Sequence, residues 1–143
     1  KGTVGHAISV VGNIAVVAHV GDSRAYLLND VIKLITKDHS FVQLLIDTGK
    51  ITEEEAKTHP DRTVITRAVG IEHVVDVEID IVDINDNDNL LICTDGLNGY
   101  VPDADILKIV NEYGDSSTEK LVETANSTGG RDNVTVVILT QGE

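Results

Sequence analysis

Leu90-Leu91-Ile92-Cys93-Thr94-Asp95-Gly96-Leu97 joins four apolar residues to a threonine and an Asp-Gly pair. A short apolar run that ends at a turn signal is typical of a buried β-strand, and the Asp-Gly pair predicts the turn itself. The carboxylate of Asp95 is therefore expected at the tip of a strand. An Asp-Gly pair is first of all a turn signal, so Asp95 alone establishes no site.

Two further aspartates occupy similar places. Asp22 follows Gly21 at the end of the apolar run 14–20, and Asp132 precedes the apolar run 134–139. Clustered oxygen ligands are what hard cations such as Mg²⁺ and Mn²⁺ prefer. The three acids together predict a divalent-metal site built on strand ends. A plain α+β domain in which all three are turn residues remains an alternative on composition and spacing alone.

The composition limits the class of protein. The chain has 143 residues, of which 41% are hydrophobic and 3% aromatic, so we expect one domain with a core of Val, Ile, Leu and Ala. The formal net charge is -13. This charge argues against nucleic acid or an anionic membrane surface as a partner, because binding to phosphates needs Lys and Arg.

Cellular location is predicted from cysteine use and from targeting patterns. Cys93 is the single cysteine and lies in an apolar run, so a buried, unreactive thiol is expected. We find neither a signal-peptide pattern nor an apolar run of about 18 residues, and we expect a cytoplasmic protein. Because the sequence opens on Lys1 without a methionine, we expect a processed product, a fragment or an excised domain.

Residues 4–35 predict two β-hairpins. Strands over 4–11 and 14–20 flank Gly12-Asn13, which is a suitable two-residue turn. A second pair of strands is expected on either side of Asn29-Asp30. The run 14–20 is apolar nearly throughout, which predicts a strand covered on both faces.

Helices and further strands follow. Capping-box spacing between Thr52 and Glu55, and again between Ser116 and Glu119, predicts the starts of two helices. Residues 58–73 show no clear period and are expected to be irregular. Apolar spacing predicts further elements, which are helices over 41–48 and 106–113 and a strand over 134–139.

Residues 75–82 alternate between apolar and acidic side chains. This period of two predicts a strand with its acidic side in solvent. The apolar side consists of Val75, Val77, Ile79 and Ile81, and the acidic side of Asp76, Glu78 and Asp80. Strands that do not alternate strictly with helices indicate an α+β fold with helices packed outside the sheets.

Five motifs occur in one order along the chain. They are Val20-Gly21-Asp22-Ser23-Arg24-Ala25-Tyr26, Thr36-Lys37-Asp38-His39-Ser40, Ile65-Thr66-Arg67-Ala68-Val69-Gly70, Cys93-Thr94-Asp95-Gly96-Leu97 and Gly130-Arg131-Asp132-Asn133-Val134-Thr135. In this order they resemble the metal-dependent protein serine/threonine phosphatases of the PP2C type (PPM family), bacterial branch. The resemblance extends over almost the whole chain, from about residue 2 to residue 139.

The resemblance implies a sandwich of two antiparallel β-sheets flanked by α-helices, with metal ions at one end. Asp95 and Asp132 would be ligands of a binuclear centre, and Asp22 would join Asp95 at a third, looser site. The ions would be Mn²⁺ or Mg²⁺, about two to three in a complete domain. Residues from about 48 to 67 would form a mobile flap beside the site. Arg67 would be a structural residue where the chain returns from this flap.

The same resemblance implies hydrolysis of phosphoserine and phosphothreonine on proteins by water that the metals activate. The substrates would be phosphoproteins made by a Ser/Thr kinase. A thiol mechanism is not expected, because Cys93 lacks the phosphate-binding loop of a cysteine phosphatase. His19 and His39 have no ligand spacing to a second histidine and are expected to be structural.

One departure from the family pattern is the absence of an Asp-Gly-x-Gly-Gly motif. In the family, the N-terminal portion that carries this motif supplies a bridging carboxylate and an arginine that holds the substrate phosphate. Residues 1–143 are therefore expected to be the C-terminal portion of one PP2C-like domain, incomplete at the N-terminus and nearly inactive alone. A catalytically dead PP2C-like binding or regulatory module is the alternative from another class.

Overall fold

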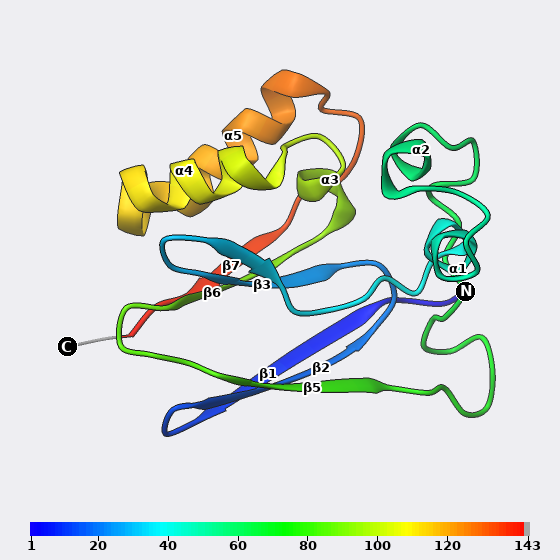
Figure 1. Cartoon of the computed structure of the whole chain (residues 1–143), viewed down its shortest axis with the longest axis horizontal. Coiled ribbons are helices and arrows are strands. Elements are labelled where there is room, and N and C mark those ends of the chain that lie inside the picture. Colours follow the sequence, from blue (N-terminus) through cyan, green and yellow to red (C-terminus); the bar gives the residue numbers. More distant parts are fainter. Residues whose placement is uncertain (142–143) are drawn as a thin grey trace.

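Two antiparallel sheets form the centre of the computed structural model, which describes residues 1–141 (Figure 1). The sheets lie face to face, as the resemblance implied. The three-stranded sheet has the order β1 (Gly5–Val11), β2 (Ile14–Val20), β5 (Glu78–Asp83). The four-stranded sheet has the order β4 (Ile32–Leu34), β3 (Arg24–Leu28), β6 (Asn89–Cys93), β7 (Val136–Leu139).

The longer helices cover one face of the four-stranded sheet. Figure 1 shows α4 and α5 packed on the side of this sheet that faces away from the three-stranded sheet. The α+β sandwich with helices outside is therefore confirmed. None of the helices in residues 1–141 is both long and apolar enough to cross a membrane. The helices are α1 (Phe41–Asp47), α2 (Glu53–Lys57), α3 (Asp95–Asn98), α4 (Asp103–Tyr113) and α5 (Ser117–Thr128), with a 3₁₀ turn over Gly114–Ser116.

Local signals account for several element boundaries. The β1–β2 hairpin turns at Gly12, whose φ is +60°, a value that suits glycine. The predicted capping box forms at α2, where Thr52 Oγ1 accepts the N–H of Glu55 at 3.2 Å and Glu55 Oε2 accepts the N–H of Thr52 at 2.7 Å. The second predicted box, at Ser116, is wrong, because the Ser116 side chain makes no cap hydrogen bond and a 3₁₀ turn leads into α5 instead.

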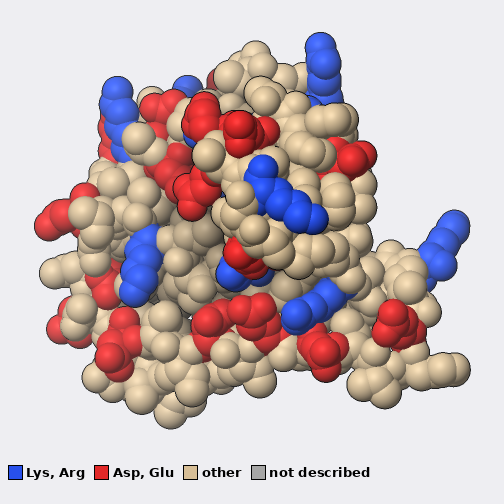
Figure 2. Space-filling model, turned by 45° about the vertical axis from the view of Figure 1, so that its right-hand side comes forward, with Lys and Arg blue, Asp and Glu red and all other residues tan. Residues whose placement is uncertain are grey.

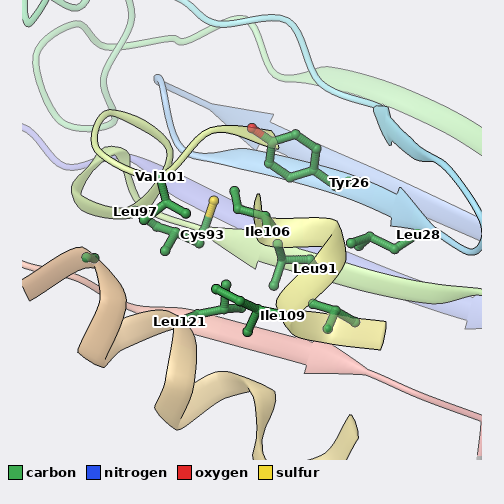
Figure 3. Close-up of a cluster of buried hydrophobic side chains, with 11 residues drawn as sticks. Tyr26, Leu28, Leu91, Cys93, Leu97, Val101, Ile106, Ile109 and Leu121 are labelled. Carbon is green, nitrogen blue, oxygen red and sulfur yellow. The ribbon is translucent and has the colours of Figure 1, made fainter. Parts of the chain in front are cut away.

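The hydrophobic core lies between the four-stranded sheet and helices α3, α4 and α5 (Figure 3). Leu91 from β6, Ile106 from α4 and Leu121 from α5 are all 0% exposed. Cys93 points into the same core, and burial raises the pKa of its thiol to about 12. The prediction of a buried, unreactive thiol is confirmed.

The orientation of β5 is opposite to the prediction. Ile79 and Ile81 are 61% and 70% exposed. Asp80 pairs with Val17 of β2, which is 0% exposed, so the acidic side of β5 faces the second sheet. Alternation in the sequence identifies which residues share a face, but the pairing with β2 decides which face meets the core.

The prediction that β2 is covered on both faces is also wrong. Its inner side chains are buried between the sheets, but Val16 and Ala18 on the outer side are only half-buried. They pair with Ile81 and Ile79 of β5. No helix or strand of residues 1–141 lies over this outer face in Figure 1. The three-stranded sheet thus presents an apolar outer face, and a face of this kind is usually an interaction surface.

Candidate metal centre

The three predicted acids lie beyond the ends of neighbouring strands. Asp22 is in the turn between β2 and β3, Asp95 is the first residue of α3 after β6, and Asp132 is in the loop between α5 and β7. In the four-stranded sheet, Arg24 pairs with Cys93, which also pairs with Val136. Each acid is therefore within a few residues of this row of paired strand ends. Figure 1 shows α3 and the loop before β7 at the same end of the sheet.

Thr94 ties the Asp95 segment to the Asp132 segment. Its backbone N–H donates to the carbonyl of Thr135 at 3.1 Å. Its hydroxyl accepts the N–H of Thr135 at 3.0 Å and donates to the carbonyl of Asn133 at 3.3 Å. Asp95 was expected in a turn but begins the one-turn helix α3, a helix that the sequence pattern missed because it is only four residues long.

Gly96 permits this close approach. A Cβ atom at Gly96 would lie 2.1 Å from the carbonyl oxygen of Asn133, which is backbone and has no rotamer through which to move away. Only glycine therefore fits between Asp95 and the loop that carries Asp132.

We expect Gly96→Ala to lower the free energy of unfolding by about 2–3 kcal/mol, at the upper end of the range for overpacking. The cause is the forced displacement of the chain at Asn133. Urea unfolding measures the change. Gly5→Ala is the matched control, since a Cβ at Gly5 has no neighbour within 4 Å. Equal effects of the two substitutions would contradict the tight contact at Gly96.

Burial and repulsion from neighbouring acids raise the pKa of Asp22 and of Asp95. Burial, followed by repulsion from Asp95, raises the pKa of Asp22 to about 6. Burial, followed by repulsion from Asp132, raises the pKa of Asp95 above its usual range. Within residues 1–141, none of the three forms an ion pair with Lys or Arg. Asp22 and Asp95 are half-buried and Asp132 is exposed. Half-buried like charges without a cation partner are an arrangement that a bound divalent ion would neutralise, and carboxylate oxygens suit Mn²⁺ or Mg²⁺.

Because its pKa is raised, ionised Asp22 destabilises the metal-free fold at neutral pH. A carboxyl whose folded pKa is about 6 and whose ordinary value is 3.8 stabilises the fold below pH 4 and loses that contribution as the pH rises through 6. We expect Asp22→Asn to increase the unfolding free energy at pH 7.5 in EDTA by about 1 kcal/mol, a figure discounted for the half-exposure of the side chain. The gain should vanish near pH 4.

Urea unfolding at both pH values measures this effect, with the exposed Asp30→Asn as control. A loss of stability in Asp22→Asn at pH 7.5 would show that Asp22 is a structural turn residue.

Another cluster of possible ligands lies nearby. In residues 1–141, one trio has all its ligand atoms within 4.8 Å, and it consists of His19, His39 and Glu78. Nδ1 of His39 accepts the backbone N–H of Gly21 at 3.0 Å. A metal on Nε2 would then require an imidazolate, whereas metal-binding histidines ordinarily donate a proton from the second nitrogen. The hydrogen bond from Gly21 therefore argues against His39 as a metal ligand in this trio.

Sequence reasoning missed the role of Asp38 beside the acids. Its carboxylate receives two hydrogen bonds from the Arg24 guanidinium, Nε to Oδ1 at 3.0 Å and Nη2 to Oδ2 at 2.9 Å. Asp38 also contributes to the raised pKa of Asp22 and of Asp95. The only signal was its place in the motif Thr36-Lys37-Asp38-His39-Ser40.

The segment 48–67 contains α2 and then returns toward α1. Ser40 pairs with Ile65 in an isolated antiparallel bridge, and Thr66 donates its N–H to the carbonyl of His39 at 2.8 Å. Arg67, at the end of the segment, donates from Nη1 to the carbonyl of Asp76 at 3.4 Å. Figure 2 shows acidic side chains in several groups over the face turned forward from the right of Figure 1, with basic side chains interspersed among them.

No family model matches the chain. The serine/threonine phosphatase stp of Listeria innocua is 42% identical over 127 residues, which cover 87% of this chain and 50% of the relative. The crystal structure of the Mycobacterium tuberculosis serine/threonine phosphatase PstP/Ppp superposes with a TM-score of 0.90 at 42% identity, covering 96% of this chain and 59% of that one. A structure of the PstP catalytic domain with two manganese ions gives a TM-score of 0.82 at 41% identity, covering 93% and 56%.

The chain therefore spans about half the length of the curated Listeria relative. Within that span, the order of the motifs, the pair of sheets and the outer helices all agree with the resemblance stated from the sequence. The PP2C-type resemblance is confirmed.

Proposed function

We propose that this chain, which is homologous to the bacterial PP2C-type serine/threonine phosphatases, is the C-terminal portion of a domain that hydrolyses phosphoserine and phosphothreonine on proteins. The observation that carries the proposal is the placement of Asp22, Asp95 and Asp132 beyond neighbouring strand ends. In this proposal the segment 48–67 is the flap beside the site.

Each acid has a role in metal binding. Asp95 and Asp132 are ligands of the binuclear centre, and Asp22 shares a looser third site with Asp95. The raised pKa values of Asp22 and Asp95 support this assignment, because a cation offsets both the burial cost and the repulsion that raise them. Oxygen ligands favour Mn²⁺ or Mg²⁺. When bound, the ions supply Lewis-acid activation of the attacking water.

The substrates are phosphoproteins produced by a Ser/Thr kinase. Nucleic acid and membrane surfaces are not partners in this proposal, in keeping with the net charge of -13. The proposed location is the cytoplasm, where a single buried thiol such as Cys93 stays reduced.

The test is an assay of the full-length protein that contains this chain. We expect Mn²⁺-dependent hydrolysis of a phosphothreonine peptide that EDTA abolishes. The 143-residue chain alone should show almost none, because it lacks the Asp-Gly-x-Gly-Gly motif. Robust hydrolysis by the short chain would contradict the proposal that it is only a portion of the site. A full-length protein that binds Mn²⁺ but hydrolyses no phosphopeptide would support the regulatory module instead.

A further inference from the structure

His39 and Gly21 exchange two hydrogen bonds. The backbone N–H of His39 donates to the carbonyl of Gly21 at 2.9 Å, and the backbone N–H of Gly21 donates to Nδ1 of the His39 ring at 3.0 Å. Gly21 has a φ of +116°, a conformation that L side chains rarely adopt. This bonded glycine comes directly before Asp22, so His39 holds the peptide from which Asp22 projects.

The hydrogen bonds fix the protonation state of the His39 ring. A backbone N–H can only donate, so Nδ1 of His39 is an unprotonated acceptor and the ring proton is on Nε2. Nε2 donates that proton to Oε2 of Glu78 at 2.7 Å. Arg67 Nη1 lies 3.3 Å from the same nitrogen, but a nitrogen that carries a proton cannot also accept from Arg67. Glu78 therefore orients the ring in the way that a carboxylate orients a metal-binding histidine.

Packing holds the same ring in place. His39 is 6% exposed and stacks on His19 with ring centroids 4.5 Å apart and planes 10° apart. Burial lowers the pKa of His39, against the smaller opposing effect of Glu78. The neutral ring is therefore the state present at neutral pH, and Nδ1 stays available to the Gly21 N–H.

From this geometry we infer that His39 is a positioning residue for the metal-binding carboxylate of Asp22. Its Nδ1 holds the Gly21 peptide, Glu78 fixes the ring, and the turn between β2 and β3 keeps Asp22 beside Asp95. The inference rests on the proposed function, because it assumes that Asp22 binds a divalent ion. His39 thereby affects metal binding, although it is not one of the proposed metal ligands.

The test compares two substitutions of His39 in the ¹⁵N-labelled full-length protein that contains this chain. His39→Asn places an amide oxygen near the position of Nδ1 and so keeps an acceptor for the Gly21 N–H. His39→Leu removes every acceptor. Mn²⁺ is the probe, and the part of the paramagnetic broadening at the Asp22 amide that Asp22→Asn abolishes reports binding at that carboxylate. His59→Leu is the matched control, since His59 Nδ1 also accepts a backbone N–H, that of Asp61 at 3.1 Å.

We expect His39→Leu to weaken Mn²⁺ binding at Asp22 by about tenfold, the size of effect seen for groups that orient ligands. His39→Asn should restore most of the affinity, and His59→Leu should leave it unchanged. Amide exchange of Gly21 should accelerate in His39→Leu alone. Rescue by Asn distinguishes positioning from a general loss of packing, because Asn restores the acceptor but not the ring.

Two contrary outcomes are distinguishable. Native affinity in His39→Leu, with an Mn²⁺ effect that Asp22→Asn abolishes, would overturn the role of His39 and leave the metal assignment intact. An Mn²⁺ effect in the native chain that Asp22→Asn does not change would overturn the assignment of Asp22, and with it the inference about His39.

Discussion

In the full-length protein, Asp95→Asn is expected to lower Mn²⁺-dependent hydrolysis of a phosphothreonine peptide by more than about 100-fold, since loss of a group that merely orients a ligand already costs 10–100-fold. Asp95 interacts with Asp22 on one side and Asp132 on the other, as the pKa shifts of Asp22 and Asp95 indicate. Removing its charge therefore weakens both proposed sites, whereas removal of Asp22 or Asp132 weakens one. The rate constant at saturating Mn²⁺ measures the loss.

Asparagine is nearly the same size as aspartate, so this substitution separates charge from packing. The matched control is Asp115→Asn, an exposed acid in the 3₁₀ turn before α5, which should leave the rate unchanged. Unfolding in EDTA should show that Asp95→Asn is at least as stable as the native protein, because the substitution removes a repelled buried charge. A rate within a few-fold of native would exclude Asp95 as a metal ligand.

The part of the site that was predictable from sequence depended on local signals. An apolar run followed by Asp-Gly locates Asp95 beyond β6, and the same logic locates Asp22 beyond β2. Both positions follow from turn chemistry, which is encoded within a few residues. The hairpin at Gly12 was predictable for the same reason. The order of the motifs then supplied the fold, which no single segment contains.

What the sequence did not predict depends on contacts between distant segments. The pairing of Asp80 with Val17 turns the acidic side of β5 inward, and alternation cannot distinguish this from the opposite orientation. Gly96 approaches Asn133, a contact between residues about a quarter of the chain apart, yet Gly96 reads in the sequence as part of an ordinary Asp-Gly turn. The bonding of His39 to Gly21 likewise joins two motifs that are separate in the sequence.

Arg24 and Asp38 form the ion pair whose disruption should most reduce stability. Arg24 binds Asp38 through two hydrogen bonds, and the side chains are 26% and 13% exposed. Nη1 of Arg24 also donates to the Tyr26 hydroxyl at 3.4 Å, which donates to Asp103 Oδ1 of α4 at 3.2 Å. This chain of bonds connects the turn after β4 to β3 and α4, so it fixes the structure around Asp22.

We expect Arg24→Met to lower the unfolding free energy by about 3 kcal/mol, the lower end of the range for breaking a buried pair, because both side chains keep some exposure. Methionine retains much of the apolar stem, so the loss comes mainly from the Asp38 carboxylate, which is left beside other acids without its partner. Asp38→Asn alone should cost a similar amount, since it weakens the bidentate contact and leaves the Arg24 charge without its counter-ion. Urea unfolding of both single variants measures these losses.

The double variant decides whether the charge is the cause. If an unpaired charge causes most of the loss in each single variant, the double variant Arg24→Met/Asp38→Asn should lose less unfolding free energy than the sum of the two single losses. The reason is that the double variant contains no unpaired charge. Strict additivity would instead mean that the two residues act through separate packing contacts. In that case, the bidentate contact between Arg24 and Asp38 would not be the interaction that holds the turn around Asp22 in place.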